Sequence, residues 1–93
     1  MRGNALEAVR LRLLSRPGCH LCDAMRADVD ALLGDWEKTW EIVDVDSDPK
    51  LSIRYGESIP VLFVNGRLFA KIRLPRLALR LRLLRAAKLG IEA

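Results

Sequence analysis

The stretch VRLRLLSRPGCHLCDAM (residues 9–25) changes its hydrophobic period at a Pro-Gly pair. Before the pair, apolar residues alternate with arginines, which is the period of two that a β-strand shows. After it, apolar residues recur every three or four positions, which predicts an amphipathic helix. Gly18 permits the sharp turn between the two. The two cysteines of the chain, Cys19 and Cys22, are therefore expected at a strand-to-helix turn.

The other segments predict further strands and helices. The helix after the turn should bury one stripe, formed by Leu21, Met25, Val29 and Leu32, and end at Gly34. Later signals predict a strand over 40–45, a short helix capped by Asp48 and ended by Gly56, a hairpin over 61–72 that turns at Asn65-Gly66, and a last helix from Pro75 to about Lys88 that stops at Gly90. The order β-α-β-α-β-β-α predicts an α/β fold with a mixed four-stranded sheet flanked by helices.

One domain is expected over residues 1–93, with its core over about 9–89, because no linker or internal repeat interrupts the pattern. Arg10 and Arg12 point to the same face of a strand that the element order makes central. That face of the sheet should therefore be thinly covered.

Composition is typical of a globular protein, with 51% apolar and 30% charged residues. The start of the chain lacks the apolar core of a signal peptide, and no run approaches the roughly 20 apolar residues of a membrane span. We therefore expect a cytoplasmic protein with no membrane partner, in a compartment where thiols stay reduced. The charge is uneven: residues 1–57 carry 8 Lys and Arg against 11 Asp and Glu, and residues 58–93 carry 8 against 1.

A C-x-x-C pair at the start of a helix favours thiol chemistry. Free backbone N–H groups and the helix dipole should stabilise a thiolate on Cys19. Cys22 lies one helical turn further in, where it can attack a mixed disulfide formed on Cys19. His20 and Arg16 add positive charge near the thiolate, and Asp23 acts against them. The sequence therefore predicts Cys19 as the nucleophile and Cys22 as the resolving thiol.

Two other uses of the pair remain open. Free cysteines are often buried core residues. Here, however, the pair follows a Pro-Gly turn, a position where core packing does not specifically require cysteine. A closed zinc site needs four ligands, and the chain offers only Cys19, Cys22 and its sole histidine, so no metal site is expected within one chain. Two chains together would supply enough cysteines to hold an iron–sulfur cluster or a metal ion between them. A non-catalytic binding protein of this kind is the alternative function.

Four segments resemble the glutaredoxins, in the order and spacing of the thioredoxin-like fold. They are LLSRPGCHLC (13–22), VDVD (43–46), YGESIPVLFVNG (55–66) and the final helix. The resemblance is greatest to small bacterial glutaredoxin-like proteins and covers nearly the whole chain. It implies a thiol–disulfide oxidoreductase that takes part in electron transport and cell redox homeostasis, with no bound cofactor and with glutathione as a co-substrate.

The resemblance also implies substrate-binding residues. Ile59-Pro60 would be the cis-proline loop that packs against the cysteines, and an X-Pro bond is where a cis peptide is best tolerated. The Ile59 backbone would then pair with an extended substrate. Arg16 matches the basic residue that glutaredoxins direct at a carboxylate of glutathione. His20, beside the nucleophile, completes the predicted substrate-binding set.

The chain departs from the glutaredoxins where they hold the far end of glutathione. That region, LFAKIRLPR (68–76), has neither the Gly-Gly pair nor the acidic pair of the family, and His-Leu replaces the common Pro-Tyr between the cysteines. We therefore expect weak glutathione binding and a preference for protein disulfides, with glutathione or thioredoxin reductase as the reductant. The chain is expected to act as a monomer.

The last helix carries two leucine stripes among its basic residues. The stripe expected to pack on the sheet consists of Leu74, Leu77, Leu81 and Leu84. Leu79 and Leu83 then lie on nearly the opposite side, as apolar contacts for an acidic protein if the helix docks one. Nucleic acid is not an expected partner, because only 5% of the residues are aromatic and they belong to the core or its edge.

Overall fold

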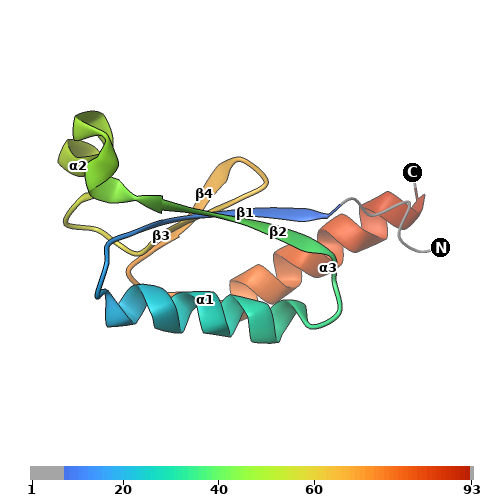
Figure 1. The fold of residues 1–93 in the computed structure, drawn as a ribbon. Helices are drawn as coiled ribbons and strands as arrows, with labels where there is room; N and C mark the ends of the chain where they lie inside the picture. The colour runs from blue at the N-terminus through green and yellow to red at the C-terminus, as the bar shows by residue number, and fades with distance from the viewer. Residues whose placement is uncertain (1–7, 93) are drawn as a thin grey trace.

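The strand-to-helix turn forms where the sequence predicts it. The computed structural model describes the backbone of residues 8–92 and the side chains of residues 8–85. Its elements are β1 (Val9–Ser15), α1 (His20–Leu33), β2 (Lys38–Asp44), the 3₁₀ turn η2 (Val45–Ser47), α2 (Pro49–Tyr55), β3 (Val61–Val64), β4 (Arg67–Lys71) and α3 (Arg76–Glu92). The predicted order of strands and helices is confirmed (Figure 1). No helix of the described residues is long and apolar enough to cross a membrane.

Local signals set most of the element ends. Asp48 caps α2 by accepting a hydrogen bond from the Lys50 N–H at 2.9 Å, as predicted. Asn65 and Gly66 have φ values of 52° and 86°, which are the two left-handed conformations that a type I′ turn requires. The predicted end of the last helix is wrong. α3 continues through Gly90, since a glycine in a helix interior costs only about 1 kcal/mol.

The sheet is mixed and has the strand order β2-β1-β3-β4. β1 pairs in parallel with β2 and antiparallel with β3, and β3 pairs antiparallel with β4. β1 is therefore central. As a result, the end of β1, the end of β2 and the start of β3 all lie at the same edge of the sheet.

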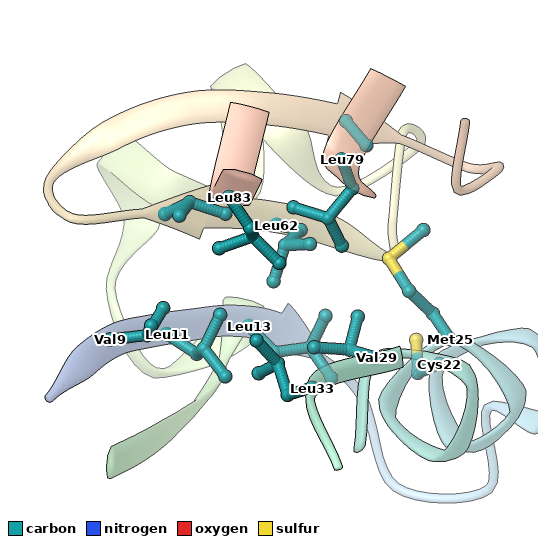
Figure 2. Packing of buried hydrophobic residues seen from close by; sticks show 12 residues of the cluster. Val9, Leu11, Leu13, Cys22, Met25, Val29, Leu33, Leu62, Leu79 and Leu83 are labelled. Atoms are coloured by element: carbon teal, nitrogen blue, oxygen red, sulfur yellow. The ribbon is translucent and has the colours of Figure 1, made fainter. Parts of the chain in front are cut away.

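α1 and α3 cover one face of the sheet, and the larger apolar cluster lies between these helices and the sheet (Figures 1 and 2). Its buried residues are Val9, Leu11, Leu13, Cys22, Met25, Val29, Leu33, Leu62, Val64, Ala70, Leu79 and Leu83. The predicted stripe of α1 is correct at Met25 and Val29 but wrong at its first position. Leu21 is 59% exposed, because Cys22 is the residue of that turn that faces the sheet.

The predicted orientation of α3 is wrong. Leu79 and Leu83 are buried in the larger cluster, with exposed fractions of 1% and 7%. Of the stripe predicted to pack on the sheet, Leu77, Leu81 and Leu84 are 69%, 55% and 53% exposed, whereas Leu74, which precedes the helix, does pack against the cluster. Both stripes of this helix are leucine, so hydrophobic periodicity alone does not decide which one faces inward. Packing against β3 and α1 decides it, as Figure 2 shows for Leu79 and Leu83.

The other face of the sheet is covered only at one end. There α2 packs over a second apolar cluster, formed by Leu14, Val45, Tyr55 and Val61. Arg10 and Arg12 are exposed on the rest of the face, and Arg12 pairs with Glu41 across β1 and β2 at 3.5 Å. They line an open hollow of about 390 Å³. The predicted thin cover is confirmed.

The two leucine stripes of α3 predict opposite effects on stability. Leu79→Ala should lower the free energy of unfolding by about 2–5 kcal/mol, because it empties a site in the core. Leu81→Ala, the matched control on the exposed stripe, should change it by no more than about 0.5 kcal/mol. Urea unfolding followed by circular dichroism measures both values. Equal effects of the two substitutions would contradict this orientation of α3.

Candidate functional site

Cys19 and Cys22 lie at the start of α1, behind the turn that follows β1. Cys19 is the N-cap residue of the helix, and its Sγ accepts a hydrogen bond from the Cys22 backbone N–H at 3.1 Å. The turn is closed by the Cys19 N–H, which donates to the Arg16 carbonyl at 3.1 Å, while Gly18 takes a φ of 81°. The capping sulfur therefore receives an N–H at a helix start, where a negative charge is stabilised.

The two cysteines form a disulfide and differ in exposure. Their Cα atoms are 5.3 Å apart, within the ordinary range for disulfides. Cys22 is only 1% exposed and belongs to the larger cluster, beside Met25 (Figure 2), whereas Cys19 is half-buried at its edge. A substrate therefore reaches the sulfur of Cys19 more easily than that of Cys22. This difference favours the predicted roles of outer nucleophile and inner resolving thiol.

The loop before β3 lies against the same cluster as Cys19. Its Ile59-Pro60 peptide bond is cis, as predicted. Pro60 is buried, and Ile59 is half-buried against both apolar clusters. The Pro60 carbonyl accepts a hydrogen bond from the Ile72 N–H at 2.7 Å, while the Ile59 backbone has no hydrogen-bond partner among the described residues. The Ile59 N–H and carbonyl are thus available to another chain.

Arg16 directs its guanidinium at Asp46. Its Nε and Nη2 donate to the two carboxylate oxygens of Asp46, at 2.7 Å and 3.0 Å. The Ser52 hydroxyl donates to the same carboxylate at 3.1 Å. The hydrogen bond from Arg16 lowers the pKa of Asp46, helped by the one from Ser52 and opposed only in part by desolvation. The predicted carboxylate-binding side chain therefore already holds a carboxylate of its own chain.

Sequence reasoning assigned Asp46 no role. The parallel register places Ser15 of β1 opposite Asp44 of β2, so the residues just after both strands meet at one edge of the sheet. An arginine after the first strand and an aspartate after the second, in VDVD (43–46), is the signal that would have found this pair. This signal can be recognised only when it is known that the two strands are paired in parallel, and that pairing is a long-range contact.

His20 is the first residue of α1, and its side chain is exposed. Within the described residues it takes part in no ion pair or side-chain hydrogen bond, so its part in substrate binding stays a prediction. The described residues contain no group of three or more His, Cys, Asp or Glu side chains placed to hold a metal ion.

Two solved structures share both fold and moderate sequence identity with this chain. The solution structure of protein Ne2328 from Nitrosomonas europaea has a TM-score of 0.73 and 25% identity, and the match covers 83% of this chain and 93% of that one. The X-ray structure of protein XcR50 from X. campestris has a TM-score of 0.65 and 29% identity, over 81% of this chain and 96% of that one.

A mutant thioredoxin from Halobacterium salinarum is similar in fold, with a TM-score of 0.53 and 21% identity over 90% of this chain and 79% of that one. The fold is therefore the predicted thioredoxin-like one. No curated protein matches the chain.

A thioredoxin-like fold with a C-x-x-C pair at disulfide distance indicates a redox function. The family of the glutaredoxin-like domain (DUF836) matches residues 10–83, which is most of the chain. These residues include all of β1 but Val9, both cysteines, the Ile59-Pro60 loop and the buried part of α3. The predicted resemblance is confirmed, and the chain belongs to the glutaredoxin-like domain family.

Proposed function

We propose that the chain is a cytoplasmic thiol–disulfide oxidoreductase that cycles between the Cys19–Cys22 disulfide and the dithiol. The observation that carries the proposal is the asymmetry of the pair. Cys19 caps α1 with its Sγ on the Cys22 N–H, while Cys22 is buried directly behind it. A thiolate at a helix start that a substrate can reach is a good nucleophile, and a buried neighbour is protected from side reactions.

The reaction takes two exchange steps. The Cys19 thiolate attacks one sulfur of a substrate disulfide, forms a mixed disulfide, and releases the other substrate sulfur as a thiolate that takes up a proton. The Cys22 thiol loses its proton and attacks the Cys19 sulfur, which releases the second substrate thiol and leaves the Cys19–Cys22 disulfide. Two electrons pass to the substrate. A thiol reductant, either glutathione or thioredoxin reductase, returns them.

The Ile59 loop provides the means to hold an extended substrate. Its backbone N–H and carbonyl have no partner among the described residues, and its side chain packs against the same cluster as Cys19. A substrate segment that pairs with this backbone would have its disulfide positioned at Cys19. Backbone pairing recognises any extended peptide, so it suits proteins as well as glutathione.

Protein disulfides suit this site better than glutathione does. The Arg16 guanidinium, expected to meet a glutathione carboxylate, is held by Asp46. By the resemblance to glutaredoxins, Lys71 and Arg73, both exposed, replace the acids expected to meet the γ-glutamyl ammonium. A glutathione molecule must therefore displace one carboxylate and approach two like charges, whereas a protein substrate has other surface to contact.

One prediction from this mechanism concerns the roles of the cysteines. Cys19→Ser should abolish the reduction of a disulfide-linked peptide, because the attacking sulfur is gone. Cys22→Ser should instead accumulate a mixed disulfide on Cys19, because the second exchange cannot occur. Mass spectrometry of the intact protein detects that adduct.

Reaction of the reduced protein with iodoacetamide at neutral pH gives an independent check, since Cys19 should be alkylated faster than Cys22. Faster alkylation of Cys22 would contradict the assignment. An absorbance spectrum of freshly purified protein distinguishes this oxidoreductase from the alternative, a non-catalytic protein that holds an iron–sulfur cluster between two chains. Such a cluster absorbs visible light and a dithiol does not.

Another prediction concerns glutathione. Calorimetric titration of the Cys22→Ser variant with glutathione should give weak binding, since one lost charge-assisted contact costs roughly tenfold to a hundredfold in affinity. Adding Asp46→Asn should raise the affinity by about tenfold, because it frees the Arg16 guanidinium for the tripeptide.

Glu41→Gln is the matched control, because it breaks the ion pair with Arg12 on the open face of the sheet and should leave glutathione affinity unchanged. Micromolar binding by the parent variant would contradict the preference for protein disulfides. An unchanged affinity after Asp46→Asn would show that the pair with Arg16 is not what limits glutathione binding.

A further inference from the structure

α3 presents an apolar stripe that no part of the described chain covers. Leu77, Leu81 and Leu84 are each more than half exposed, and their spacing puts them on one side of the helix. Leu79 and Leu83 on the inner side already anchor the helix in the core. The outer stripe therefore contributes little to folding, and a contiguous exposed apolar surface of this kind is typical of an interaction site.

Two hollows lie beside α1, and Leu84 of the stripe lines the larger of them. The hollow at the far end is about 380 Å³ and is lined by Ala31, Leu32, Trp36, Arg80, Leu83 and Leu84. The smaller one, about 190 Å³, is lined by Leu21, Ala24, Met25, Asp28, Ile72, Arg73 and Leu74. An ion pair from Arg76 to Asp28, at 2.7 Å, joins the two helices.

The smaller hollow lies between α1 and the segment that joins β4 to α3, beside the candidate active site. Leu21 lies between the two cysteines in sequence and is 59% exposed. Ile72 is 47% exposed, and its N–H is hydrogen-bonded to the carbonyl of Pro60 in the substrate loop. A partner whose disulfide reaches Cys19 would therefore meet Leu21 and Ile72 first and the stripe of α3 beyond them.

The charges beside the stripe select the partner. Arg73, Arg80 and Arg85 are exposed, and none forms an ion pair with another described residue. Their guanidinium groups complement carboxylates placed along the flank of a docked helix. A flat anionic membrane fits less well, because α1, on the same side of the sheet (Figure 1), presents the exposed carboxylate of Asp23.

We propose that the outer side of α3, next to α1, is the docking surface for an acidic amphipathic helix of a protein substrate. Its apolar side packs on Leu77, Leu81 and Leu84, and its carboxylates face Arg80 and Arg85. The inference rests on the proposed disulfide chemistry and adds a substrate class to it, namely proteins whose reducible disulfide lies next to such a helix.

The test uses two synthetic peptides and one small disulfide. Each peptide carries a fluorescent thiol in disulfide linkage to its single cysteine, followed by an amphipathic helix of about 14 residues, long enough to be marginally helical. The flanks of the helix carry Glu in one peptide and Gln in the other. An aromatic disulfide too short to reach α3 reports the chemistry alone. Stopped-flow fluorescence or absorbance follows a single turnover of the pre-reduced protein in excess and gives the second-order rate constant, which corresponds to kcat/KM, for each.

The acidic peptide should react with a kcat/KM about tenfold above that of the neutral peptide, and added salt should remove this advantage. Leu77→Gln with Leu81→Gln should lower the acidic peptide's kcat/KM by about tenfold, and Arg80→Gln with Arg85→Gln should make the two peptides equal. Ile53→Gln is the matched control, because Ile53 is 87% exposed but lies on α2, and this variant should behave as the parent does.

Equal rates for the two peptides, with the aromatic disulfide reduced normally, would overturn the docking surface and leave the proposed function standing. Failure to reduce the aromatic disulfide would overturn the proposed function itself. The docking proposal would also be overturned if the Leu77 and Leu81 substitutions abolished self-association in sedimentation, or binding to anionic phospholipid vesicles, without affecting either peptide.

Discussion

The pairing of β1 on both of its edges is the constraint on which the rest of the structure depends. Because β2 runs parallel to β1 and β3 runs antiparallel, two strand ends and one strand start meet at a single edge of the sheet. The turn with Cys19, the Asp46 carboxylate and the Ile59-Pro60 loop follow or precede those strands directly. Residues up to about forty positions apart in sequence therefore form one site without any long connecting loop.

Burial of β1 also explains why the two faces of the sheet differ. Its leucines at alternate positions hold α1 and α3 on one face, and its arginines keep most of the other face in solvent. Only Leu14, next to the cysteine turn, joins the second cluster beneath α2. The apolar cover is thus complete at the end of the sheet that carries the site, where both clusters contact Ile59.

Local chemistry made most of the fold predictable, whereas choices between similar surfaces did not follow from it. The Asp48 cap, the Asn65-Gly66 turn and the position of the cysteine pair each depend on residues close in sequence. The inward stripe of α3 depends on which of two leucine stripes fits against β3 and α1, and a periodic pattern carries no information on that. The pairing of Arg16 with Asp46 likewise depends on a strand register. The sequence therefore indicated Arg16 as a site residue but not Asp46.

The unequal burial of the two sulfurs has a consequence for damage by peroxides. An oxidant that reaches Cys19 converts it to a sulfenic acid, and further oxidation of that group to a sulfinic acid is irreversible. Cys22 is shielded from the same oxidant at 1% exposure, yet the Cα atoms of the pair are only 5.3 Å apart. Its thiol would condense with the sulfenic acid, expelling water and restoring the disulfide. The buried cysteine thus protects the more accessible one from permanent loss, whatever substrate the protein serves.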